Sequence, residues 1–139
     1  MTINQRHQAR IFAMQALFQW HFTEETPEIL LQDFISEHVV DEKAVDLPYC
    51  RLLFLDTVKN IAVIDNAMTP LLDRKISLLN PLELSVLRLA ISELQYHPEV
   101  PQKVAINEAI ELTKEFGSAD GYKFVNAVLN AFIKKSQSS

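Results

Sequence analysis

The sequence predicts a small all-α protein, and two observations support this prediction. Apolar residues recur at spacings of three and four along almost the whole chain of 139 residues, and alternation with a period of two is sustained nowhere. Four of the six prolines stand where such an apolar pattern begins, and the first turn of a helix tolerates the missing N–H of proline. Only two glycines are present, which excludes Gly-rich phosphate loops and dinucleotide fingerprints.

The same periodicity divides the chain into seven expected helices joined by short connections. Asp46 with Pro48 and Asn80 with Pro81 supply a side-chain acceptor and a proline at two of the starts, and Gly117 marks one of the ends. The expected helices cover residues 4–22, 28–37, 48–68, 70–76, 81–96, 101–116 and 119–135.

The helix expected at residues 81–96 is apolar around most of its circumference, with a narrow polar line at Ser85, Arg88, Ser92 and Gln95. A helix of this kind is surrounded by other helices. We therefore place it at the centre of a C-terminal bundle. The prediction is one domain over residues 1–139, in which an N-terminal helical subdomain (about 1–76) and this C-terminal bundle (about 77–139) share one core.

The formal charge of −5 is local. Residues 24–46 contain eight acids and a single lysine, residues 1–23 contain two arginines and no acid, and the rest of the chain is neutral. The acidity therefore does not argue against a nucleic-acid partner, and we expect RNA to avoid the acidic segment. No apolar run approaches the length of a membrane span and no signal peptide is recognisable, which predicts a cytoplasmic protein.

The first expected helix carries two opposed apolar faces. One face is an ordinary core face, and the second follows the same spacing on the other side with Ile11, Met14, Phe18 and Phe22. Either another helix of this chain covers the second face, or it is a docking surface for another protein.

Basic side chains on three helices are candidates for contacts with RNA. Arg6 and Arg10 stand four residues apart on the first helix without an acid nearby on that helix, so that they can bind phosphates or be merely solvated. Lys103 and Lys114 share one line of the sixth helix. In the last helix, Lys123 precedes an aromatic residue, and the ring of Phe124 either stacks on an unpaired base or belongs to the core.

The residues that catalysis needs are missing from the sequence. The four histidines never stand at the spacing of a metal-ligand pair, and no serine or cysteine lies in a nucleophile motif. Cys50 is interpreted as a small buried hydrophobic residue. Three carboxylates, Glu108, Glu111 and Glu115, either hold a divalent cation or form a solvated face. We predict a protein that is not an enzyme and has neither cofactor nor metal.

Four segments stand in an order that characterises one bacterial family. They read ARIFAMQALF at residues 9–18, VLRLAISEL at 86–94, VAINEAIEL at 104–112 and KFVNAVL at 123–129. Together they resemble the NusB family of transcription antitermination factors. The resemblance implies a seven-helix fold and a heterodimer with NusE, a ribosomal small-subunit protein. It also implies binding of single-stranded boxA RNA, as part of an RNA polymerase complex that reads through terminators in ribosomal RNA operons.

The resemblance assigns roles to individual positions of this sequence. Phe18, Phe22 and Glu83 match the side of the family that faces NusE. The RNA-binding set comprises Arg6, His7, Arg10, Lys103, Lys114, Lys123 and Phe124. At His7 and Gln8, relatives often carry further arginines, and this departure should weaken contact with phosphate.

Two other functions remain open at the level of the sequence. An RNA-binding accessory domain of RNA cytosine methyltransferases shares this fold, although such a protein continues into a Gly-rich cofactor domain. A plain helical interaction module is the second alternative, in which the acidic segment binds a basic protein.

Overall fold

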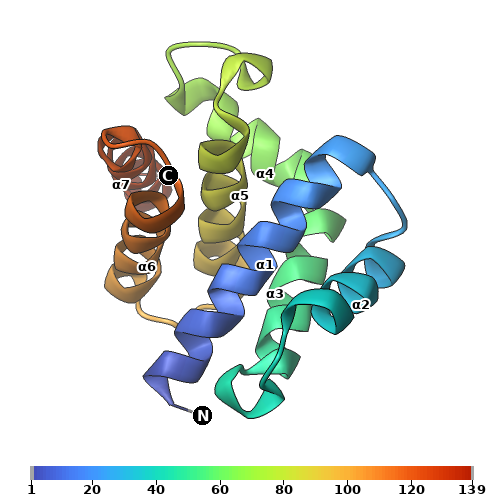
Figure 1. Ribbon diagram of the computed structural model, residues 1–139. Coiled ribbons are helices and arrows are strands. Elements are labelled where there is room, and N and C mark those ends of the chain that lie inside the picture. The colour runs from blue at the N-terminus through green and yellow to red at the C-terminus, as the bar shows by residue number, and fades with distance from the viewer. Residues whose placement is uncertain (1, 139) are drawn as a thin grey trace.

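The structure is a computed structural model that describes residues 2–138, with side chains described up to residue 137. Within that range it contains seven α-helices, three short 3₁₀ turns and no strand, as the sequence predicted (Figure 1). No helix in the described part of the chain is long and apolar enough to cross a membrane. The α-helices are α1 (Ile3–Thr23), α2 (Pro27–His38), α3 (Leu47–Lys59), α4 (Ile61–Met68), α5 (Pro81–Tyr96), α6 (Gln102–Phe116) and α7 (Gly121–Ser138).

The helix starts confirm the capping residues that the sequence indicated. The Asp46 side chain accepts a hydrogen bond from the backbone N–H of Tyr49 at 3.1 Å, at the start of α3. The Asn80 side chain accepts from the N–H groups of Leu82 and Glu83 at the start of α5. Each acceptor satisfies N–H groups that have no partner inside the helix, which fixes where the helix begins.

Helix α5 is surrounded by other helices, as predicted, and these come from both halves of the chain. Its residues from Leu84 to Glu93 are all buried, and it contacts α1, α3, α4, α6 and α7. Three residues of its polar line, Ser85, Arg88 and Ser92, are buried as well. Arg88 binds both carboxylate oxygens of Asp65 on α4, at 3.0 and 2.8 Å. The buried apolar side chains form one continuous core cluster around this helix.

Helix α1 packs across both α3 and α5, and α6 and α7 pack on α5 (Figure 1). Arg10 of α1 contacts Glu93 near the end of α5, whereas His21 lies 3.4 Å from Arg88, closer to the start of α5. The two helices therefore run in roughly opposite directions. The acidic helix α2 lies on the opposite side of the molecule from α6 and α7 (Figure 1).

Two predicted helices differ from the observed elements. The helix expected at residues 48–68 is divided into α3 and α4 at Asn60, whose side chain donates to the carbonyl of Asp56 at 2.8 Å. The backbone N–H of Asn60 donates to the same carbonyl, but the φ of −106° and ψ of 20° at Asn60 depart from helical values and change the direction of the chain. The helix expected at 70–76 is replaced by the 3₁₀ turns η2 (Thr69–Leu71) and η3 (Ile76–Leu78). So short a helix is marginal without extensive packing.

Part of the second apolar face of α1 is covered by this chain, and part of it is exposed. Ile11 and Met14 are buried within this chain, so the reading as internal core is correct for this part of the face. Phe18 is half-buried, and Phe22 is 62% exposed. The two rings contact each other edge to face, with centroids 5.1 Å apart. Only the C-terminal end of the face is therefore open to a partner.

Candidate functional site

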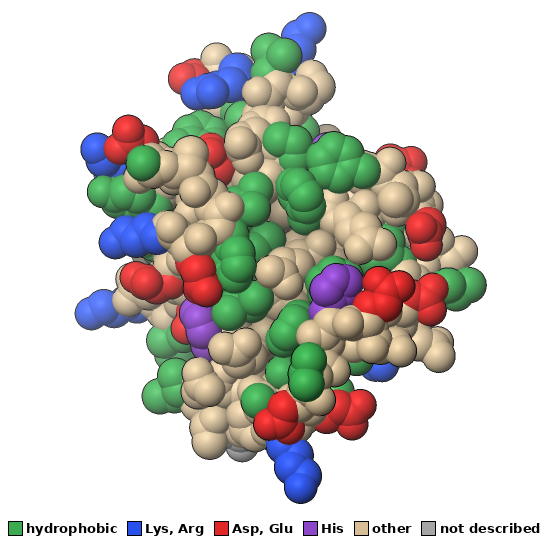
Figure 2. Space-filling view, viewed as in Figure 1, with side chains coloured by type: hydrophobic (Ala, Val, Ile, Leu, Met, Phe, Trp, Pro, Cys, Tyr) green, Lys and Arg blue, Asp and Glu red, His purple; other side chains and the backbone are tan. Residues whose placement is uncertain are grey.

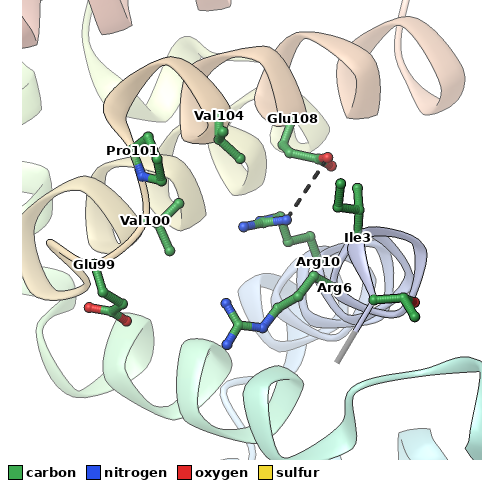
Figure 3. A pocket seen from close by; sticks show the side chains of 9 residues that line it. Ile3, Arg6, Arg10, Glu99, Val100, Pro101, Val104 and Glu108 are labelled. Atoms are coloured by element: carbon green, nitrogen blue, oxygen red, sulfur yellow. Dashed lines mark ion pairs between the residues drawn. The ribbon is translucent and has the colours of Figure 1, made fainter.

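A pocket of about 450 Å³ opens between the first turns of α1 and the start of α6. Arg6 and Arg10 reach into it from α1, and Glu99, Val100 and Pro101 bound it on the opposite side (Figure 3). The pocket arises because α6 begins next to the N-terminal end of α1. Its remaining lining residues are Thr2, Ile3, Val104 and Glu108.

Arg10 is buried in an ion pair, with a side chain that is only 5% exposed. Its Nε atom lies 3.1 and 2.9 Å from the two carboxylate oxygens of Glu93, and its Nη1 atom lies 3.9 Å from Glu108 (Figure 3). The Tyr49 hydroxyl also donates a hydrogen bond to Glu93. Arg10 is therefore a centre of packing between α1, α3, α5 and α6.

Arg6 is held less tightly and is 36% exposed. Its Nε atom donates to Asp46 at 3.0 Å, and its guanidinium carbon lies 3.8 Å from the centre of the Tyr49 ring. The first helix itself carries no acid near the two arginines, as the sequence indicated, but each arginine pairs with an acid from another element. The acids come from α5 and from the residue that precedes α3, and no spacing rule along α1 could have revealed them.

His7 and Lys103 complete the predicted basic residues at this end. The Nδ1 atom of His7 lies 2.5 Å from a carboxylate oxygen of Glu108, and Lys103 is exposed at the start of α6. Arg6, His7 and Arg10 therefore each meet a carboxylate. The structure brings these predicted residues together, but it surrounds them with negative charge.

The other predicted RNA contacts lie at the far end of α6. Lys103 and Lys114 are separated by eleven residues, about 16 Å along an α-helix. The amino group of Lys114 lies 4.8 Å from the Tyr122 ring centre, and Lys123 is exposed and pairs with Asp120 at 3.3 Å. Phe124 is half-buried, with the guanidinium of Arg74 at 5.1 Å from its ring centre. The predicted set thus forms two groups.

Charged side chains are distributed unevenly over the surface of the molecule. In Figure 2, Lys and Arg side chains are visible along the edge over α6 and α7, mixed with acids. Acidic side chains gather along the opposite edge over α2, and hydrophobic side chains lie between the two edges. One acid of the segment 24–46 departs from this separation, because Asp46 is buried against Arg6.

The three residues predicted to face a protein partner occupy two elements. Phe18 and Phe22 stand at the C-terminal end of α1. Glu83 stands at the start of α5, where the Ser118 hydroxyl donates to its carboxylate at 3.5 Å. Because α1 and α5 run in opposite directions, both places belong to the same end of the helix pair. A Cβ atom on Gly121 would lie 2.7 Å from the Glu83 carboxylate, so the glycine permits this close approach.

Burial shifts the pKa of two groups at the start of α3. Burial and the neighbouring Glu93 carboxylate raise the pKa of Tyr49 above its ordinary value. Burial raises the pKa of the Cys50 thiol to about 12, and Cys50 is the buried hydrophobic residue that the sequence predicted. Both groups keep their protons in the folded chain.

Several residues of the site were not identified from the sequence. Tyr49, Glu93 and Glu99 were not singled out, and Asp46 was named only as a helix cap. One signal was available for Glu93, because a carboxylate inside an otherwise apolar helix requires a buried partner. Among the described residues, no group of three or more His, Cys, Asp or Glu side chains could hold a metal ion.

The fold and the site define an all-helical protein with exposed lysines and acids mixed along α6 and α7 and an open aromatic pair at the end of α1. The family model described as "NusB family" matches residues 7–134. The transcription antitermination protein NusB of Coxiella burnetii (strain Dugway 5J108-111) is 52% identical over 125 residues, 90% of this chain and 89% of the relative. The protein of the same name from Pasteurella multocida is 45% identical over 92% of this chain and 88% of the relative.

Solved structures agree with the sequence relatives. A crystal structure of the antitermination factors NusB and NusE in complex with double-stranded RNA matches with a TM-score of 0.87 at 27% identity, covering 96% of this chain and 99% of that chain. NusB from T. maritima matches with a TM-score of 0.81 at 30% identity, covering 93% and 90%. The chain belongs to the NusB family. This is a family of transcription antitermination factors and not of enzymes, as the sequence predicted.

Proposed function

We propose that this chain is a transcription antitermination factor that binds RNA together with NusE. The observation that carries the proposal is the family match over residues 7–134, supported by the likeness to a NusB in complex with NusE and double-stranded RNA. In this proposal the pair binds the boxA element of nascent RNA in the cytoplasm. As part of an RNA polymerase complex, it promotes read-through of terminators in ribosomal RNA operons.

The RNA path in this proposal follows α6 between the two basic groups. Lys103, Lys114 and Lys123 are exposed and can neutralise phosphates. Arg6 and His7 contribute at the start of the path, and Phe124 at its end. Arg10 does not contact the RNA directly in this proposal, because its guanidinium is enclosed by Glu93 and Tyr49. It supports the RNA-binding surface through the packing of the helices.

A titration of boxA RNA at two salt concentrations, with and without NusE, tests this proposal. Lys103→Glu and Lys123→Glu should each weaken binding at low salt about tenfold or more, because each reversal replaces an attraction to phosphate by a repulsion. Lys59→Glu is the matched control, since Lys59 is exposed at the end of α3, away from α6. If all three variants bind equally, or if NusE does not tighten binding, the proposed RNA path is wrong.

The partner surface in this proposal comprises Phe18, Phe22 and Glu83. Phe22→Asp is the sharper test, because Phe22 is 62% exposed and its replacement should not disturb the core. It should abolish NusE binding in calorimetry while helicity is retained. Ile29→Asp on α2 is the control, since Ile29 is similarly exposed at 56%. Equal NusE affinity of the two variants would exclude this surface.

A further inference from the structure

The pocket between α1 and α6 has the wrong charge for a phosphate site. Arg6 and Arg10 line it, but each donates its Nε hydrogen bond to a carboxylate, and Glu99 and Glu108 line the pocket as well. Phosphate groups are held by an excess of positive charge, which this pocket lacks. Its volume of about 450 Å³ lies within the usual range for pockets that enclose small ligands, roughly 300–1,000 Å³.

The pocket does have the surfaces that a planar, uncharged ring requires. Val100, Pro101 and Val104 supply an apolar side, and Val104 is 40% exposed at its edge. Figure 3 shows the Arg6 guanidinium projecting into the open space toward Glu99 and Val100. Nucleic-acid bases that leave the stack are commonly bound on guanidinium planes and apolar side chains.

Tyr49 fixes the Arg6 guanidinium in this orientation. Its ring centre lies 3.8 Å from the guanidinium carbon of Arg6, and its hydroxyl donates to the buried Glu93. Asp46 is the second group that holds Arg6, because it accepts the hydrogen bond of the Nε atom. A side chain held in this way loses little further entropy when a ring stacks on it.

We propose that this pocket binds one unstacked RNA base, which stacks on the guanidinium of Arg6 opposite the apolar side formed by Val100, Pro101 and Val104. The inference rests on the proposed RNA-binding function and adds a base-binding subsite to it. The phosphates of the same strand then lie outside the pocket, along the lysines of α6. The site differs from the base stacking predicted for Phe124, whose ring lies close to Arg74.

An abasic scan of boxA RNA, with the full chain and NusE present, tests the proposal. Removal of the base at one position should weaken binding to the wild-type protein about tenfold, as expected for the loss of one stacked base. Val104→Trp fills the pocket from its edge and should weaken binding of intact RNA by a similar factor. RNA that is abasic at this position should bind the wild type and Val104→Trp equally, because both lack the same contact. Val63→Trp on α4, where Val63 is 57% exposed, is the control and should bind like the wild type.

Arg6→Lys provides a second variant if Val104→Trp does not fold. It retains the positive charge but removes the planar face, so it should lose the discrimination between intact and abasic RNA while keeping the salt dependence of binding. The proposal is wrong if removal of the base and Val104→Trp lower the affinity for RNA independently of each other. It is also wrong if Arg6→Lys still discriminates between intact and abasic RNA as well as the wild type does. Failure of the wild type to bind boxA RNA at all would instead contradict the proposed function.

Discussion

Basic side chains lie next to both ends of α6, but their surroundings differ at the two ends. Next to its start, Arg6, His7 and Arg10 each contact a carboxylate from another element, and the Arg10 side chain is only 5% exposed. Near its end, Lys123 is 67% exposed, and within the described part of the chain it pairs only with Asp120, three residues earlier. The first group is part of the packing, whereas the second group is surrounded by solvent.

This difference separates two uses of positive charge. A buried arginine that has lost its water depends on its carboxylate partners, so it fixes the relative positions of the helices. A solvated lysine contributes little to stability, but it is free to exchange its weak partner for a phosphate. We therefore expect a change at Arg10 to alter folding and a change at Lys123 to alter RNA affinity.

The largest expected effect comes from Arg10→Met. The substitution leaves the Glu93 carboxylate buried without its cation, which should lower the free energy of unfolding by about 3–5 kcal/mol. Urea denaturation followed by circular dichroism measures the loss. The double variant with Glu93→Leu should recover part of it, but not all, because the Tyr49 hydroxyl then loses its acceptor.

Lys123→Met is the comparison from the other end of α6 and should change the unfolding free energy by less than about 0.5 kcal/mol. Similar losses of unfolding free energy in Arg10→Met and Lys123→Met would contradict the difference proposed between the two ends.

High pH should lower the free energy of unfolding by a smaller amount, through the buried groups Tyr49 and Cys50 at the start of α3. The pKa of Cys50 is raised from 9.0 to about 12, so the unfolded chain releases this proton first as the pH rises. Stability should therefore fall above pH 9, by about 1.4 kcal/mol per pH unit. The raised pKa of Tyr49 should add to the decline above pH 10.

Denaturation curves between pH 8 and pH 11 measure this decline. In Cys50→Ala the loss of stability should begin only near pH 10, where the phenol of Tyr49 titrates in the unfolded chain. An unchanged onset in this variant would show that other groups cause the decline.

The next smaller effect is expected when single lysines of the proposed RNA path are neutralised. Lys114→Gln and Lys123→Gln should each weaken boxA binding several-fold and reduce the slope of log affinity against log salt by about 1, because each removes one phosphate contact. Arg10→Lys should leave the slope unchanged. Fluorescence anisotropy at four salt concentrations resolves the slopes, and a reduced slope for Arg10→Lys would mean that this side chain reaches the RNA.

The local features of the fold could be predicted from the sequence because they depend on neighbouring residues. The caps at Asp46 and Asn80 and the enclosed position of α5 follow from short patterns. The division of residues 48–68 was missed because it depends on the backbone conformation at Asn60, which periodicity does not reveal. The same periodicity could not show which part of the second face of α1 stays open at Phe22.

The candidate site was predicted only as a set of residue types. Arg10 and Glu93 are 83 positions apart, and their pairing follows from the way α1 lies across α5. No pattern along α1 records that contact, so Arg10 was expected to be free. The exposed lysines were easier to interpret, because a solvated side chain needs no partner from elsewhere in the chain.

The smallest expected effect tests whether Lys123 is available to RNA. Asp120 holds the Lys123 amino group at 3.3 Å and is itself 82% exposed, so phosphate must compete with this carboxylate. Asp120→Asn removes both the competitor and a repulsive charge next to the proposed RNA path, and boxA affinity should rise about twofold at low salt, with the gain screened at high salt. The unfolding free energy should change by less than about 0.5 kcal/mol, because an exposed pair contributes little to stability. In the background of Lys123→Gln the gain should shrink, since only the general repulsion then remains to be relieved. A gain of equal size in both backgrounds would mean that Asp120 acts on the RNA directly, and that Lys123 is already free at this end of α6.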